Sequence, residues 1–541
     1  MRLSIDELKF SEKDKQNPTV LLLLDIIRQQ AEELEKLNEK NNALTAEINT
    51  LKDEINRLKN HPRKPDVKPS TLEDKKPSQE GKKPKKRPGS TKRKKTSEIT
   101  VHEDLPIEPT HLPEGARFIR YKDFLVQGIR FEAHNIRYRL KSYQLPDGSC
   151  VTGKLPDNLN GKHFSPELVS FILYQHYHCH VTQPLLLEQL YEIGIDISKG
   201  QINNILIEGK EKFHEEKNQI IAVGLEVSSY INVDDTGARH QGKNGYCTYI
   251  GNELFSWFES TFSKSRINFL KLMRAGRQDY ILNPDAIAYM AINQFPACMR
   301  NKVIGFLGST FENDHQWECF LADNGINNDR HKKIITEAAL IGSIIEHGIS
   351  NNLVVVSDDA GQFNVLIHAL CWIHAERTIE KIIPYSDQAA ADLDNIKEQI
   401  WSLYQDLKRY KENPNKKDKR RIELLFDDIF SSTTHSATLN QALKRLLLNK
   451  DELLLALRRP DIPLHNNSAE NAIREYVKKR KISGGTRSDT GRRARDTFIS
   501  LKKTCRKLGL SFWQYLNDRV SGLGKIPSLP DLIKVRVSKP G

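Results

Sequence analysis

The chain has 541 residues, with 83 Lys and Arg against 70 Asp and Glu, and a formal net charge of +13. This length allows three or four domains, and the positive balance favours a polyanionic partner. Seven dispersed cysteines without a CxxC pair disfavour a secreted disulfide framework, and no apolar run approaches the roughly 20 residues of a membrane span. We therefore expect a cytoplasmic protein with no membrane partner.

A heptad pattern marks the first 60 residues. Its seam alternates spacings of three and four and consists of Leu34, Leu37, Asn41, Leu44, Ile48, Leu51, Ile55 and Leu58. Ile at a positions with Leu at d positions favours two parallel helices, and one buried Asn at an a position fixes their register. We expect residues 1–60 to form a coiled coil that makes the chain a homodimer. The alternative is one long amphipathic helix packed on its own chain.

Residues 61–100 form a basic, proline-rich segment. They contain six prolines and 14 Lys or Arg against 5 Asp or Glu. Such a composition cannot build a core and predicts a disordered linker. The dense positive charge is typical of segments that contact nucleic-acid phosphates, although it would also serve solubility alone.

Residues 101–225 are expected to form a DNA-binding region. The pattern predicts strands over 118–126 and 129–143 and a helix over 166–178. Two helices over 183–193 and 199–209, joined by a glycine-containing turn, are typical of a helix-turn-helix, although other tight helical corners look similar.

Ser198 is the expected N-cap of the second helix of this pair. Recognition helices present their first residues to base edges, and the candidates here are Lys199, Gln201, Asn203 and Asn204. His176, His178, Cys179 and His180 resemble metal ligands, but no second pair follows at zinc spacing. We therefore do not expect zinc.

Two predicted strands end in pairs of carboxylates. Residues 230–237 form an apolar strand that ends in Asp234 and Asp235, and residues 353–359 repeat the pattern with Asp358 and Asp359. Candidate strands over 246–251 and 254–260 lie between them, a short helix is predicted over 362–370, and residues 263–349 resist assignment. Residues 375–457 are predicted to be almost entirely helical.

Glu470 opens a later helix, beside strong positive charge. From Arg474 to Lys507 there are 13 Lys or Arg against 3 Asp or Glu. A capping box, with Asn467 at the N-cap and Arg474 as an ion-pair partner of Glu470, would explain this carboxylate without any chemistry. Single Asp residues at strand ends likewise occur as caps or in turns. Together, however, three carboxylates at the carboxyl ends of strands and beside a basic run favour a site for two Mg²⁺ ions, which would support phosphoryl transfer.

Several segments resemble the insertion sequence sixty-six family of bacterial DDE transposases. They are Asp234-Asp235-Thr236, the run Cys371-Trp372-Ile373-His374-Ala375-Glu376-Arg377, and Asn466-Asn467-Ser468-Ala469-Glu470 with the later Gly484-Gly485. The resemblance implies a ribonuclease-H-like α/β catalytic domain with a helical insertion, and DNA cleavage and strand transfer at the ends of a mobile element. Motif matching puts the catalytic, metal-binding triad on Asp234, Asp358 and Glu470, with Asp235 and Asp359 as alternatives.

The resemblance also implies Mg²⁺, or Mn²⁺ in its place, as cofactor. The implied partners are element ends, target DNA and helper proteins from the same element. DNA contacts are expected from the basic run, at Arg474, Lys478, Lys479, Arg480 and Arg487. Unlike many family members, the chain has no cysteine pair between 101 and 150. The alternative function is a dimeric DNA-binding regulator derived from a transposase, with a decayed catalytic site.

The expected organisation is multidomain. It comprises a coiled coil over 1–60, a basic linker over 61–100, a DNA-binding region over 101–225 with a helix-turn-helix near 183–209, the first part of the catalytic domain over 226–374, a helical insertion over 375–460, and the C-terminal part of the catalytic domain with its basic DNA-contacting run over 461–541.

Overall fold

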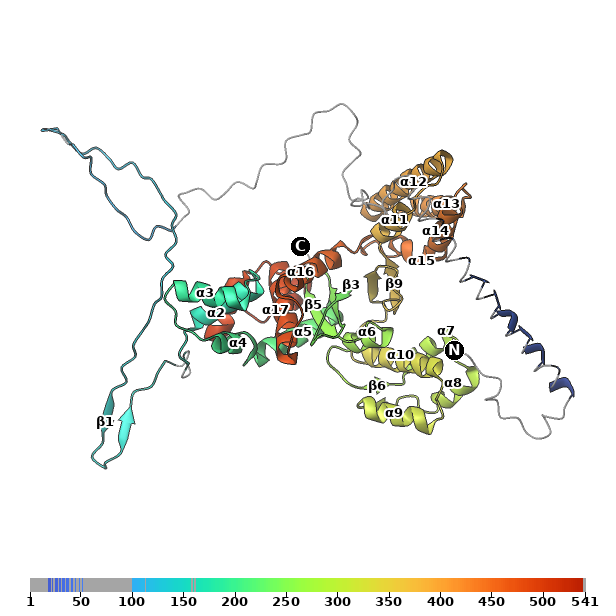
Figure 1. Ribbon diagram of the computed structural model, residues 1–541, viewed down its shortest axis with the longest axis horizontal. Coiled ribbons are helices and arrows are strands. Elements are labelled where there is room, and N and C mark those ends of the chain that lie inside the picture. Colours follow the sequence, from blue (N-terminus) through green and yellow to red (C-terminus); the bar gives the residue numbers. More distant parts are fainter. Residues whose placement is uncertain are drawn as a thin grey trace. The chain divides into compact units, whose positions relative to one another are not determined.

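The computed structural model describes residues 100–538 apart from 112, 157, 158, 160 and 161, together with scattered positions between 18 and 51 (Figure 1). The chain divides into two compact units. A helical unit comprises Met1–Leu72 and Trp372–Asp461, and a sheet-containing unit comprises Glu73–Cys371 and Ile462–Gly541. The sheet-containing unit is therefore built from two separate stretches of chain.

The expected coiled coil and basic linker lie largely outside the described residues. Of the linker, only Thr100 is described. In the heptad segment, Ile55 and Leu58 also lie outside, whereas the described seam residues are helical and their side chains are exposed. They are Leu34, Leu37, Asn41, Leu44, Ile48 and Leu51.

A mixed five-stranded sheet forms the centre of the sheet-containing unit. Its strands, in spatial order, are β5 (Ser256–Thr261), β4 (Tyr246–Gly251), β3 (Tyr230–Gly237), β8 (Val354–Ser357) and β9 (Ile367–Leu370). The pairs β5–β4 and β4–β3 are antiparallel, and the pairs β3–β8 and β8–β9 are parallel. The fold class is therefore mixed α/β, and the predicted strands β3, β4, β5 and β8 are confirmed to within two residues.

Strand β9 corrects the sequence prediction. A short helix over 362–370 was the expected element, but residues 367–370 pair with β8, with Val354 opposite Ile367 and Ser357 opposite Leu370. A short, mostly apolar stretch such as Ile367–Leu370 fits either a helix or a buried strand, so its pattern alone cannot decide between them. The free edge of β8 decides it here, because pairing satisfies the backbone groups of both strands.

The two faces of the sheet are covered by different helices. On one face, α16 (Asn467–Ser483) packs Ala469, Ile473 and Tyr476 against Tyr249 and Phe258. On the other face, α5 (Glu211–Val227) and α10 (Asp329–Glu346) contribute to the larger core, which includes the alternate strand residues. Successive strand residues point to opposite faces, and this alternation later separates Asp234 from Asp235.

Helix α17 (Asp489–Lys507) protects the outer edge of β5. The backbone N–H groups of Ser256, Phe258 and Ser260 donate to Thr504 Oγ1, Ser500 Oγ and Asp496 Oδ2, at 3.1, 2.9 and 2.8 Å. Four helical residues rise about 6 Å and two strand residues about 6.6 Å, so every helical turn meets the next outward N–H group. An edge strand covered in this way cannot pair with another chain.

The segment between β5 and β8, which the sequence left unassigned, is mainly helical. It contains α6 (Arg266–Met273), β6 (Tyr280–Ile281), α7 (Pro284–Ile292), α8 (Ala297–Ile304), β7 (Thr310–Phe311), α9 (Asp314–Asp323) and α10. Strands β6 and β7 form a small antiparallel pair. The segment is thus an insertion between the edge strand β5 and the interior strand β8.

The remaining helices are divided between the two units. In the sheet-containing unit they are α2 (Pro166–Tyr177), α3 (Gln183–Glu192), α4 (Lys199–Ile207), α18 (Phe512–Ser521) and α19 (Leu529–Ser538). In the helical unit they are α11 (Trp372–Glu380), α12 (Asp387–Glu412), α13 (Lys416–Ser431), α14 (Ala437–Leu448), α15 (Lys450–Leu453) and the 3₁₀ turn η4 (Leu455–Leu457). Within the helical unit, the indole N–H of Trp372 at the start of α11 donates to Leu453 O in α15 at 2.8 Å.

The strands expected over 118–126 and 129–143 are absent from the described residues, so this prediction is wrong. Only a short exposed hairpin forms nearby, from β1 (Ser142–Gln144) and β2 (Cys150–Thr152). Phe118, Ile119 and Phe124 are at least two-thirds exposed. The pattern had the composition of strands, but a strand needs a partner for its backbone groups, and none of the described residues supplies one here.

Candidate active site

Asp234 lies on the central strand β3, directly after two buried residues. Ile231 and Val233 anchor the strand in the core, and Asp234 follows them half-buried. Asp234 pairs with Tyr249 of β4, so its side chain shares a face with Tyr249, the face that α16 covers. Asp235 faces the opposite side, where its carboxylate accepts a hydrogen bond from Gln362 Nε2 at 2.8 Å.

The carboxyl group of Asp234 is strongly perturbed. Burial is the main reason that its pKa rises to about 7. The backbone N–H of Asp235 lowers the pKa by donating to Asp234 Oδ1 at 2.8 Å, whereas the charges of Asp358, Asp235 and Glu470 all raise it. The candidate carboxylates thus lie close enough to repel one another electrostatically.

Asp358 follows the strand next to β3. The parallel pairing of the two strands ends with Asn232 opposite Val356, and Asp234 and Asp358 each come two residues later. Asp358 is half-buried and accepts a hydrogen bond from Ala360 N at 3.2 Å, in a turn rather than at a helix start. Asp359 is exposed, and its charge raises the pKa of His368, not that of Asp234. The structure therefore brings Asp358 to Asp234 more closely than it brings Asp359.

Glu470 lies in the first turn of α16, on the same face of the sheet as Asp234. The capping box that the sequence offered as an alternative does not form, because the N-cap is Asn466 rather than Asn467 and no side chain caps this helix. The buried Asn466 instead donates from Nδ2 to Val233 O at 2.7 Å. The expected ion pair does form, since Arg474 donates to Glu470 Oε2 at 3.1 Å. Arg474 is two-thirds exposed, so this pair is screened by water.

The donor set suits a hard divalent cation. The charges of Asp358 and Glu470 act on Asp234, and this repulsion would be relieved by Mg²⁺ or Mn²⁺, which prefer oxygen ligands. Within the described part of the chain, no three His, Cys, Asp or Glu side chains already stand at metal-ligand spacing. The residues fit the cation by the chemistry of their oxygen donors and by their charge.

The basic residues expected to contact DNA differ in exposure. Lys478 and Arg487 are exposed, whereas Arg480 donates to Gly237 O and, at 3.4 Å, to Thr236 Oγ1 at the end of β3. Lys479 is buried and donates to His176 O at 2.8 Å. Burial lowers the pKa of Lys479 to about 7, and the charge of Arg495 contributes. A direct phosphate contact from Lys479 is therefore not expected, which corrects the sequence hypothesis for this residue.

The candidate DNA-reading residues lie at the start of α4. Ser198 caps this helix as predicted, accepting from Gln201 N at 3.1 Å. Lys199, Gln201 and Asn204 are exposed, whereas Asn203 is half-buried and accepts from Gln183 Nε2 at 3.3 Å. Three of the four candidates are thus accessible.

The histidines at the end of α2 make contacts inside the protein. His176 Nδ1 lies 2.9 Å from Val181 O, and the His178 ring stacks on Tyr174. His180 Nε2 lies 3.1 Å from Glu475 Oε1 on α16. The last of these contacts joins the segment that follows α2 to the helix that carries Glu470.

The sequence did not single out Gln362 or Asn466, both of which bond groups beside Asp234. Gln362 follows Asp358 by four residues, and Asn466 belongs to the asparagine pair of the family-like motif. Their partners are 127 and 233 positions away in the chain. A short-range pattern carries no signal for contacts of this kind.

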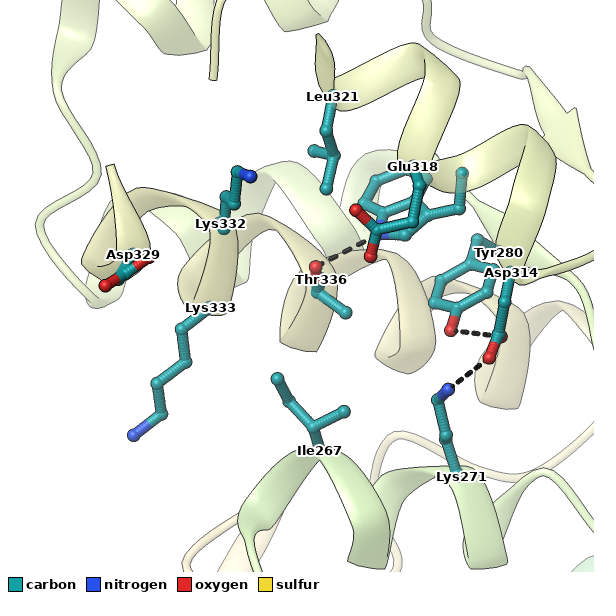
Figure 2. Close-up of a pocket in the computed structure, with 11 residues that line it drawn as sticks. Ile267, Lys271, Tyr280, Asp314, Glu318, Leu321, Asp329, Lys332, Lys333 and Thr336 are labelled. Atoms are coloured by element: carbon teal, nitrogen blue, oxygen red, sulfur yellow. Dashed lines mark hydrogen bonds and ion pairs between the residues drawn. The ribbon is translucent and has the colours of Figure 1, made fainter. Parts of the chain in front are cut away.

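A separate pocket of about 260 Å³ lies on the insertion between β5 and β8 (Figure 2). Asp314 accepts from Lys271 Nζ and from Tyr280 Oη, both at 2.7 Å, at its rim. None of the candidate catalytic carboxylates lines this pocket.

Within the described part of the chain, no helix is both long and apolar enough to cross a membrane.

Comparison with known proteins gives two matches. Residues 326–494 match the model of the family described as "Transposase IS66 family". The uncharacterised protein y4jO of Sinorhizobium fredii is 44% identical over 303 residues, which cover 56% of this chain and 94% of that protein. The family match includes Asp358 and Glu470, and Asp234 precedes it. The resemblance drawn from the motifs is thereby confirmed: residues 326–494 form an IS66-family transposase domain, and the chain belongs to that family.

Proposed function

We propose that the protein is a DDE transposase that cleaves DNA strands at the ends of a mobile element and transfers them to a target. The observation that carries this proposal is the crowding of carboxylates around Asp234, with Asp358 at the matching position of the next parallel strand and Glu470 near enough to raise its pKa. Carboxylates crowded without a cation are typical of metal-dependent phosphoryl-transfer sites.

We further propose that the sheet-containing unit holds a ribonuclease-H-like catalytic fold. Three antiparallel strands followed by two parallel ones, in the order β5-β4-β3-β8-β9, support this assignment. In this proposal the catalytic domain comprises residues 226–374 and 461–541, with the helical block over 375–460 as an insertion. The α3–α4 pair would be the helix-turn-helix of the DNA-binding region over 101–225.

Asp234, Asp358 and Glu470 would hold the divalent cations. When bound, such ions lower the pKa of a nucleophilic hydroxyl and stabilise the leaving oxygen in an in-line displacement. The carboxylates themselves need only stay ionised and converge, and no Ser or Tyr nucleophile of the protein is required. Asp235 would keep Gln362 against the strand end, because its carboxylate accepts from that amide.

DNA would be held by exposed cations around this site. On α16 and the turn that follows, Lys478 and Arg487 are accessible to phosphates, and Arg474 would exchange between Glu470 and the backbone of DNA. At the start of α4, Lys199, Gln201 and Asn204 would read bases at the element ends.

Strand cleavage by the full-length chain tests the proposal. With Mg²⁺ and duplex DNA that carries the element ends, the wild type should nick DNA. Asp234→Asn, Asp358→Asn and Glu470→Gln should each lower nicking by orders of magnitude, because the amide cannot hold the ion, while DNA affinity stays near that of the wild type. Asp359→Asn is the matched control and should nick normally.

Two outcomes would contradict the proposal. If all three triad variants nick DNA like the wild type, these carboxylates are not the catalytic ligands. If the wild type binds the ends as a dimer but never nicks them with Mg²⁺ or Mn²⁺, the decayed DNA-binding regulator is the better description.

A further inference from the structure

Asn466 is a buried polar residue whose hydrogen bonds leave its own helix. It is 1% exposed and stands at the N-cap of α16, where an asparagine side chain ordinarily accepts from a helical N–H group. Here the side chain makes no such bond. Nδ2 donates to Val233 O at 2.7 Å, and Oδ1 accepts from Asn232 Nδ2 at 2.9 Å. Both of these side-chain hydrogen bonds therefore go to residues of the central strand β3.

The backbone carbonyl and N–H group of Asn466 make two further hydrogen bonds. Its carbonyl accepts from Glu470 N at 3.1 Å, which forms the first turn of α16. Its N–H donates to Cys371 Sγ at 3.1 Å. Cys371 is buried and its own N–H donates to Ser357 O at 2.9 Å. We call Asn232, Val233, Cys371 and Asn466 the Asn466 network.

This network reaches a residue adjacent to each candidate ligand on the strands. Val233 immediately precedes Asp234, and Ser357 immediately precedes Asp358. Glu470 is one helical turn from Asn466, and the two share a backbone hydrogen bond. Asp234 and the two carboxylates whose charges raise its pKa therefore lie on backbone segments that Asn466 joins.

We infer that Asn466 is a positioning residue, with Cys371 as its second anchor, that fixes the Glu470 carboxylate relative to Asp234 and Asp358 for divalent-cation binding. The inference rests on the proposed function. It also gives the cysteine of the Cys371-Trp372-Ile373-His374 run a role as hydrogen-bond acceptor, not as metal ligand or nucleophile. Residues that orient metal ligands typically change metal affinity 10- to 100-fold when removed.

Binding of Mn²⁺ alone to the full-length chain, followed by electron paramagnetic resonance, tests this inference without any need for activity. Asn466→Asp keeps the shape of the side chain but turns the donor that faces Val233 O into an acceptor. We expect it to raise the Mn²⁺ dissociation constant at least about tenfold. Cys371→Ala should also weaken binding, whereas Cys371→Ser keeps an acceptor for the Asn466 N–H and should stay near the wild type.

Asn283→Ala is the matched structural control. Asn283 is likewise a buried asparagine at a helix start, and its side chain donates to Gly342 O at 3.1 Å, but it lies in the insertion between β5 and β8. It should lower the unfolding temperature without changing Mn²⁺ affinity. Circular dichroism of every variant shows that the fold persists.

The outcomes separate the inference from the proposed function. If wild type binds Mn²⁺, Asp234→Asn abolishes that binding, and Asn466→Asp and Cys371→Ala bind as tightly as Asn283→Ala, the positioning role is wrong and the metal site stands. If Cys371→Ala and Cys371→Ser bind equally well, the thiol is no anchor. If the wild type itself binds no Mn²⁺, the proposed site fails, and the inference fails with it.

Discussion

Asp234 illustrates how a single residue can lower the stability of the metal-free chain. Its pKa is raised to about 7, chiefly by burial, from about 3.9 in an unfolded chain. An acid with a higher pKa in the folded state binds its proton more tightly there, so folding stability falls as the pH rises between these two values. Ionisation of Asp234 therefore opposes folding at neutral pH unless a cation is present.

The first prediction follows for Asp234→Asn in metal-free solution. At pH 8 the variant should unfold at a higher temperature than the wild type, and its free energy of unfolding should be larger by about 1–2 kcal/mol. At pH 4 the two proteins should be nearly equally stable. Asparagine can still accept the Asp235 N–H hydrogen bond, so the carboxylate charge is the main difference. Thermal unfolding with a chelator at both pH values measures the effect.

Two comparisons make this measurement specific. Asp323→Asn, at the exposed end of α9, should show no such pH dependence. Mg²⁺ should raise the unfolding temperature of the wild type more than that of Asp234→Asn, because a ligand stabilises only the folded form that binds it. If Asp234→Asn is less stable than the wild type at pH 8, burial and neighbouring charges do not raise the pKa of Asp234.

Among the elements, the contact between α17 and β5 shows how side chains can replace a sixth strand. Ser500 Oγ accepts from Phe258 N at 2.9 Å, and both groups are buried. Ser500→Ala would leave that N–H group without its acceptor. We expect the free energy of unfolding to fall by about 1–3 kcal/mol, as measured in urea.

Thr490→Ala, an exposed hydroxyl in the first turn of the same helix, should change stability by less than about 0.5 kcal/mol. Equal effects of the two substitutions would mean that the β5 edge does not depend on α17. Self-association of Ser500→Ala at high protein concentration would fit an edge strand that has become free to pair.

Elements were predictable from the sequence where a local pattern decided the structure. The strand that ends at Asp234 and the Ser198 cap of α4 rest on neighbouring residues, and both are found. Strand β9 and the N-cap of α16 depend on partners distant in the chain: the helix predicted in place of β9 was wrong, and the alternative capping box at Asn467 does not form. Asn466 looks like an ordinary helix-starting residue until Val233, 233 positions earlier, is brought beside it.

At the scale of the whole molecule, the candidate carboxylates come from three distant places in the chain. The insertion between β5 and β8 and the helical block over 372–461 separate them in sequence. The insertion begins after β5, and the helical block lies between β9 and α16. Neither segment therefore interrupts the pairing of β3 with β8. Short-range sequence features identify the candidate carboxylates, whereas the strand pairing and the contacts of Asn466 join segments that are distant in the chain.

The last prediction concerns assembly of the full-length chain. The described heptad leucines are exposed, among them Leu37 at 62% and Leu44 at 55%, and leucines at d positions pack across a two-stranded coiled coil. The wild type should sediment as a dimer through residues 1–60. Leu37→Glu combined with Leu44→Glu should yield monomers, because the seam would then bury like charges. Lys36→Glu, one residue off the seam, should remain dimeric. A monomeric wild type at tens of micromolar, or an unchanged dimer in the double variant, would mean that the heptad segment does not hold the dimer.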